Sequence, residues 1–168
     1  MCTGVSLHPR TLVIAERGAQ LTLVETFATI GGSAYFTNHV AEVVVGENAR
    51  VDHYKVQREG GDAFHVGTIQ ATQDRGYIYH AFSFAVGAQL SRTNVYSELV
   101  GEGCEVRLNG LYALEEAQHA DHQTFVEHIA PSCSSREVHK GILDGTSHGV
   151  STARIYAHPA APKPPATP

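Results

Sequence analysis

Short stretches in which polar and apolar residues alternate dominate the chain. Residues 20–23 (QLTL) and 105–108 (EVRL) alternate in this way, and residues 77–82 (YIYHAF) have the composition of a strand. Alternation with a period of two places successive side chains on opposite faces of a β-sheet. The nearest candidate for a helix, residues 114–122, is rich in Ala and Glu but has no apolar stripe. The pattern therefore predicts an all-β protein.

A recurring turn phrase introduces these stretches, made of a glycine or acidic turn, a small residue and then an alternating run. It begins at Gly18, Gly46, Asp74, Gly87 and Gly101. The steps between these positions are 28, 28, 13 and 14 residues, which indicates a period of about 28 and a half-period of about 14. Two strands and two turns per repeat are typical of a coil in which each turn covers the last.

We therefore predict a parallel β-helix of five or six turns, and an antiparallel sandwich or barrel remains the alternative, because it too has short strands and regular turns. Asn109 and Gly110 favour the alternative, since Asn-Gly between alternating residues is typical of a two-residue hairpin turn. If the two residues lie inside a strand instead, Gly110 marks a bulge or a close backbone approach.

The size and charge of the chain limit the kinds of protein it can be. A chain of 168 residues has room for one domain with its own core. The formal net charge is −5, and the lysines, which are Lys55, Lys140 and Lys163, are scattered. Because phosphate binding needs a clustered basic surface, we expect no nucleic-acid partner.

The cysteines and the apolar runs bear on the location of the protein. Cys2, Cys104 and Cys133 are odd in number and have no paired spacing, so we expect no disulfide framework and a reducing compartment. No run of about 18 apolar residues is present, and residues 1–10 lack a basic start followed by an apolar stretch. The sequence thus predicts no membrane association and a cytoplasmic protein.

Histidine is frequent, and His119, His122, His128 and His139 lie close around Cys133. Imidazole and thiolate are good ligands for iron or zinc. On one strand His122 and His128 share a face, whereas His119 lies on the other, and no CxxC, HxH or HExxH motif is present. His128 and Cys133 are the best candidate pair for a metal, provided that a turn brings them together, and structural or solvent-exposed histidines are the alternative.

Catalytic motifs are weaker still. No GxxxxGK[ST] loop and no GxSxG elbow is present. Asp121 and Glu127 could form the carboxylate pair of a glycosidase, and polysaccharide-cleaving enzymes do use β-helices, so a polysaccharide-active enzyme is the rival hypothesis. We predict no catalytic residue and a protein that is not an enzyme.

Residues 101–150 closely resemble the central β-helix of the SufB/SufD family of iron–sulfur cluster assembly scaffolds. The resemblance rests on the phrases LVGEG, LNGLY, QH-x-D, H-x-AP, SSRE and KGILDG, and residues 8–25 look like the family's entry into its core. The form of residues 135–145 is similar to the SufD branch more than to the SufB branch.

This resemblance implies a right-handed parallel β-helix that serves as a non-catalytic scaffold of the SUF system. It implies a SufB-like partner and a SufC-like ABC-type ATPase, with iron or an iron–sulfur cluster held at most transiently in the complex. It assigns no cofactor firmly to this chain.

The sequence also departs from the family. After Gly149 and Val150, the residues 151–153 (STA) replace the family's FNG, and the ATPase-docking region has no counterpart. We expect a truncated or partial version with a lead-in at 1–9, a SufD-like core at 10–158 and a Pro-rich disordered tail at 159–168. An uncovered last turn would leave a free strand edge, so we expect a homo- or hetero-oligomer.

Overall fold

The computed structural model describes residues 4–32 and 34–159. This part of the chain is all β-structure, and the helix considered for residues 114–122 is instead a turn followed by the start of a strand. In chain order the strands are β1 (Val5–Leu7), β2 (Arg10–Ala15), β3 (Gln20–Ala28), β4 (Tyr35–Val45), β5 (Arg50–Glu59), β6 (Ala63–Gln73), β7 (Ile78–Gly87), β8 (Leu90–Leu99), β9 (Glu105–Leu114), β10 (His119–His128), β11 (Ser134–Leu143) and β12 (His148–Ala157).

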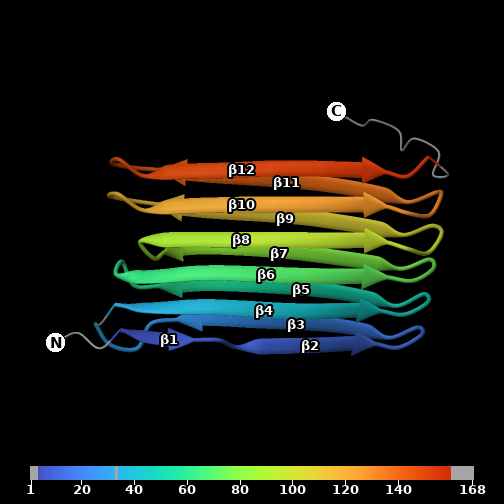
Figure 1. Ribbon diagram of the computed structural model, residues 1–168, viewed down its shortest axis with the longest axis horizontal. Helices are drawn as coiled ribbons and strands as arrows, with labels where there is room; N and C mark the ends of the chain where they lie inside the picture. Colours follow the sequence, from blue (N-terminus) through green and yellow to red (C-terminus); the bar gives the residue numbers. More distant parts are fainter. Residues whose placement is uncertain (1–3, 33, 160–168) are drawn as a thin grey trace.

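The strands form two stacked sheets, and from β3 onward the chain crosses from one sheet to the other at each turn (Figure 1). One sheet has the order β1-β4-β6-β8-β10-β12, with β2 also pairing β4, and the other has the order β3-β5-β7-β9-β11. All of these pairings are parallel. The predicted parallel β-helix is therefore confirmed, and the antiparallel alternative is wrong.

The register confirms the period read from the sequence. Register partners lie 26 to 30 positions apart, as in Phe64 with Leu90 at 26, Tyr35 with Ala63 at 28 and Gln20 with Arg50 at 30. The predicted turn phrases fall between strands, where Gly18 and Gly76 have φ of 70° and 71°. Glycine reaches this left-handed region without a steric penalty, which explains the glycine at these two positions.

Asn109 and Gly110 lie inside β9 and not in a hairpin turn. A Cβ on Gly110 would be 2.2 Å from Cδ2 of His139 on the neighbouring strand. The position thus marks a close approach to the backbone, which is the second of the two interpretations offered by the sequence.

The interior between the two sheets has two regions, an apolar core and a region lined by polar side chains. The later halves of the strands in the first sheet face the earlier halves of the strands in the second, because short turns connect them (Figure 1). This region holds the apolar core, which includes Val43, Val45, Val51, Tyr79, Leu99 and Val106. Within residues 4–32 and 34–159, no helix has the length and apolar character needed to cross a membrane.

Candidate functional site

Buried polar and charged side chains line the interior beyond the apolar core. They stack in register along the solenoid, so the same position on successive turns contributes to one continuous column. In the sheet of β3 the column is Glu25, Lys55, Ser83, Gly110 and His139, and in the sheet of β4 it is His39, Gly67, Thr93 and His122.

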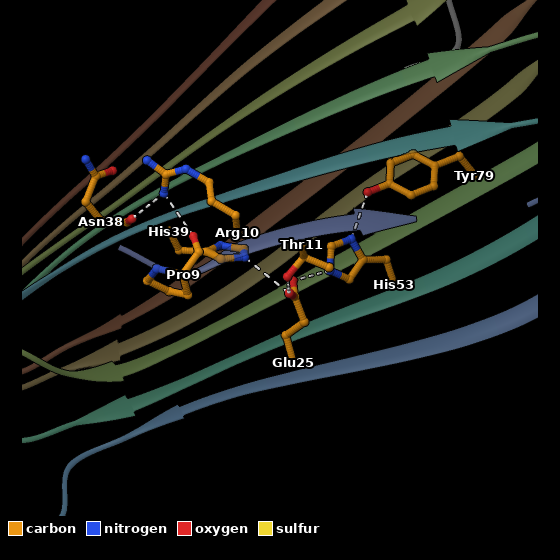
Figure 2. A network of polar contacts seen from close by, with 8 residues as sticks. All are labelled: Pro9, Arg10, Thr11, Glu25, Asn38, His39, His53 and Tyr79. Atoms are coloured by element: carbon orange, nitrogen blue, oxygen red, sulfur yellow. Dashed lines mark hydrogen bonds and ion pairs between the residues drawn. The ribbon is translucent and has the colours of Figure 1, made fainter. Parts of the chain in front are cut away.

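Glu25 is the centre of the first network in this region (Figure 2). The Thr11 hydroxyl donates to Glu25 Oε1 at 2.7 Å, and Nε2 of His39 lies 3.2 Å from the same oxygen. His53 Nε2 lies 2.8 Å from Oε2, and its Nδ1 is 3.0 Å from the Tyr79 hydroxyl. Burial alone would raise the pKa of Glu25, but the hydrogen bonds with His39 and His53 outweigh it and hold that pKa far below its usual range.

Glu59 is the centre of a second network, one turn further on. Its Oε2 lies 2.7 Å from His65 Nδ1, and it accepts hydrogen bonds from Thr37 at 2.9 Å and from Gln57 at 3.1 Å. Burial acts to raise the pKa of Glu59, but His65 and the other partners lower it overall. The pKa of His65 itself falls to about 4, because burial and then the charge of Lys55 disfavour its protonated form.

Lys55 is a buried amine between these networks and the next turn. Lys55 is only 1% exposed, and its Nζ donates a hydrogen bond to Thr93 Oγ1 at 2.9 Å. Burial lowers its pKa to about 8, against the opposing charges of Glu59 and Glu25. A Cβ on Gly67 would be 2.9 Å from Nζ, so the glycine leaves the space that the amine occupies.

His122 and His139 close the column on the far side of Lys55. Their ring centroids are 5.2 Å apart, and His139 Nδ1 lies 2.9 Å from Glu137 Oε1. Within the described residues neither ring nitrogen of His122 has a hydrogen-bond partner. Burial, followed by the charge of His139, lowers the pKa of His122 to about 4. Lys55, His122 and His139 line a cavity of about 20 Å³, which is room for one water molecule.

The chain also matches the model of a known protein family. The model described as SUF system FeS cluster assembly, SufBD core domain, matches residues 2–167. The chain belongs to this family. The resemblance inferred from the sequence phrases is thereby confirmed, and the two-sheet solenoid is the form that this SufBD core domain takes.

Several curated relatives support the same assignment for the SufBD core domain. An iron-sulfur cluster assembly SufBD family protein of Synechocystis is 30% identical over an alignment of 167 positions that covers 95% of this chain and 37% of the relative. The iron-sulfur cluster assembly protein SufD of Escherichia coli is 27% identical over 148 residues, 88% of this chain and 35% of the relative. The chloroplastic protein ABCI7 of Arabidopsis thaliana is 28% identical over 141 residues, 83% of this chain and 30% of the relative. The chain thus spans roughly a third of the length of these relatives.

The two candidate metal ligands take separate partners in the SufBD core domain. Nε2 of His128 lies 3.0 Å from Ser135 Oγ, and the Cys133 thiol donates to the Gly101 carbonyl at 3.2 Å. No group of three or more His, Cys, Asp or Glu side chains in residues 4–32 and 34–159 has a metal-holding arrangement. Whether His128 and Cys133 bind a metal stays a prediction.

The carboxylates of the rival glycosidase hypothesis lie on the outward face of β10. Asp121 and Glu127 are six residues apart on one strand, which is about 20 Å at the rise of a β-strand. A glycosidase pair needs at most about 10 Å. Asp121 pairs with Arg92 at 3.1 Å and Glu127 with His158 at 2.6 Å. The two side chains therefore cannot flank one sugar bond.

The buried polar network of the SufBD core domain was not predicted from the sequence. In β5 the inward positions read Val51, His53, Lys55, Gln57 and Glu59, whereas an ordinary buried strand face is apolar. The signal was therefore present as polar residues in the inward phase of the alternation. It could be recognised only once the structure showed which residues of β5 face inward.

Proposed function

We propose that the chain is a non-catalytic scaffold and interaction subunit of the SUF iron–sulfur cluster assembly system. The observation that carries the proposal is where the chemistry-bearing side chains lie. His53, Lys55 and His122 are enclosed between the two sheets and line a cavity of about 20 Å³. A polymer or metabolite is far larger than this cavity, so the side chains fit a role in organising the interior better than one in substrate turnover.

The outward face of the β3 sheet supports an interaction role. Val24, Tyr54, Phe82 and Val138 occupy one register row across it, interrupted by Asn109. Val24, Tyr54 and Val138 are 61%, 41% and 52% exposed. A row of exposed apolar side chains on a flat sheet is typical of a protein–protein interface.

We infer that this face receives a SufB-like subunit and that a SufC-like ABC-type ATPase joins the resulting complex in the cytoplasm. The relatives from Synechocystis and Escherichia coli are iron–sulfur cluster assembly proteins, and their longer chains leave room for contacts outside the matched region. Iron or an iron–sulfur cluster is the cargo of the complex, bound transiently and not as a resident cofactor of this chain.

The partner proposal is tested by co-expression and affinity capture with SufB-like and SufC-like proteins. Tyr54→Lys places a charge in the middle of the exposed row and should abolish capture of the SufB-like subunit. Gln70→Lys, on the outward face of β6 in the other sheet, is the matched control and should leave capture intact. Equal capture of the SufB-like subunit by both variants would show that this face does not bind it.

The cargo proposal is tested by elemental analysis of anaerobically purified protein. We expect iron in the captured complex and little in the chain alone. His128→Ala and Cys133→Ala test the candidate ligands, since either change should lower the iron content of the complex if the pair holds it. Stoichiometric iron in the isolated chain would contradict a transient cargo.

A further inference from the structure

Cys104 and Cys133 occupy matching positions on adjacent turns of the solenoid. Cys104 directly precedes β9 and Cys133 directly precedes β11, and the register of these strands pairs Glu105 with Ser134. The Ser134 amide donates to the Cys104 carbonyl at 2.8 Å, which holds the two backbones side by side. Neighbouring strands lie about 4.8 Å apart, and a disulfide accepts Cα separations of about 4.4 to 6.8 Å.

The two thiols also converge. Sγ of Cys104 lies 2.7 Å from the Gly101 carbonyl oxygen, and Sγ of Cys133 lies 3.2 Å from the same atom. Because both sulfur atoms contact one oxygen, they lie less than about 6 Å apart, on the same side of the two strands. Tyr77 takes the next position in this column, and its buried hydroxyl has no hydrogen-bond partner within residues 4–32 and 34–159.

We propose that Cys104 and Cys133 form a reversible intramolecular disulfide when the protein meets a hydroperoxide. The hydroperoxide oxidises the first thiol to a sulfenic acid and is itself reduced to its alcohol, which is water in the case of hydrogen peroxide. The second sulfur then attacks the sulfenic sulfur, the S–S bond forms, and hydroxide leaves and takes up the second thiol proton as water. A thiol reductant reverses the bond by exchange.

The exposure of the two cysteines indicates which of them is oxidised first. Cys133 is 7% exposed and follows the exposed Ser132, whereas Cys104 is only 1% exposed. Cys133 therefore meets the peroxide first, and Cys104 is the resolving thiol. Burial, followed by the charge of Cys133, raises the pKa of Cys104 to about 11. Only the thiolate attacks, so the resolving step should speed up about tenfold per pH unit between pH 7 and 9.

The bond would fasten the β8–β9 turn to the β10–β11 turn. The two cysteines are 29 positions apart in the chain, so the link closes a loop of that size. Constraining such a loop in the unfolded chain raises stability, and we expect the melting temperature to rise by about 5 to 10 °C. The sequence predicted no disulfide framework, and a single reversible bond differs from a framework because the protein folds without it.

The test is peptide mapping of the reduced full chain after treatment with hydrogen peroxide. Trypsin cuts at Arg92, Arg107 and Arg136, which places Cys104 in peptide 93–107 and Cys133 in peptide 108–136. We expect one cross-linked product of these two peptides, about 2 Da lighter than the sum of the free peptides, that disappears after dithiothreitol.

Variants and an unfolded control decide the outcome. Cys104→Ser and Cys133→Ser should each abolish the cross-link, whereas Cys2→Ser, at a position outside the described residues, should retain it. The same peroxide treatment in urea should lose the preference for this pair. Cross-links that involve Cys2 alone, or two free alkylatable thiols at 104 and 133 after oxidation of the native protein, would overturn the proposal.

Discussion

The ring of His139 lies against the backbone of Gly110, its register partner on the neighbouring strand, so closely that a Cβ on Gly110 would be 2.2 Å from His139 Cδ2. The ring cannot move away freely, because His139 Nδ1 is held 2.9 Å from Glu137 Oε1. Glycine at this position is therefore a packing requirement of the polar column and not a turn signal.

Gly110→Ala should destabilise the protein by about 1 to 2 kcal/mol. The overpacking cost of about 1 to 3 kcal/mol exceeds the modest gain from replacing glycine in a strand. Urea denaturation measures the change in the free energy of unfolding. Gly61→Ala is the control, since a Cβ there meets nothing within 4 Å, and the double variant Gly110→Ala/His139→Ala should recover part of the loss. An unchanged midpoint for Gly110→Ala would refute the packing requirement.

Glu25→Gln should destabilise the protein by about 2 to 4 kcal/mol at pH 7, because it removes the charged acceptor shared by Thr11, His39 and His53. The folded state lowers the pKa of Glu25 below the usual 4.5, so its contribution is present above that pH and is lost as the pH falls. The difference between wild type and variant should therefore shrink below about pH 4.5.

Glu42→Gln provides the comparison for Glu25, since Glu42 lies exposed on the outward face of β4. Chemical denaturation of both variants from pH 3.5 to 7 separates the two positions, and we expect less than about 0.5 kcal/mol for Glu42→Gln. Similar losses of stability for the two variants would mean that the buried Glu25 network stabilises the protein no more than an exposed glutamate does.

Lys55→Met should change how the free energy of unfolding depends on pH above about pH 8. Burial lowers the pKa of Lys55 from 10.5 to about 8, so between these values the unfolded chain holds a proton that the folded chain has released. Unfolding free energy then rises with pH, and the wild type should gain about 3 kcal/mol relative to Lys55→Met between pH 8 and 10.5. Stability curves measured at intervals across this range give the difference directly.

The control for the buried amine is Lys140→Met, which changes an exposed lysine on β11. Comparing each variant with wild type at the same pH cancels the opposing effect of the buried Tyr79 hydroxyl, whose pKa is raised above its usual value. Parallel curves for wild type and Lys55→Met would show that the amine is not buried as described.

His122→Leu should make the protein less sensitive to acid. The folded state lowers the pKa of His122 from 6.5 to about 4, so stability is lost as the pH falls between these values, where the unfolded chain binds the proton more readily. Relative to wild type, the variant should gain on the order of 2 to 3 kcal/mol between pH 7 and pH 4. Thermal unfolding across this range measures it, and His119→Leu, on the outward phase of the same strand, should show no such gain.

Much of the fold could be predicted from local features of the chain. The turn phrases at Gly18, Gly46 and Gly101 fixed the repeat, because a solenoid reuses one turn geometry on each coil. The alternation also placed His122 and His128 on one face of their strand and His119 on the other, which the structure confirms. The metal role of His128 and Cys133 stays a prediction.

What the sequence determined by itself is the alternation of side chains between the two faces of each strand, since the side-chain period of two depends only on local backbone geometry. Which inward residues meet across the interior was decided by the tertiary structure. Lys55 reaches Thr93 in the opposite sheet, 38 positions away, and Glu25 reaches His39 in the opposite sheet, 14 positions away. Such contacts depend on the lengths of all intervening turns and on the gap between the two sheets, and no local pattern encodes either quantity.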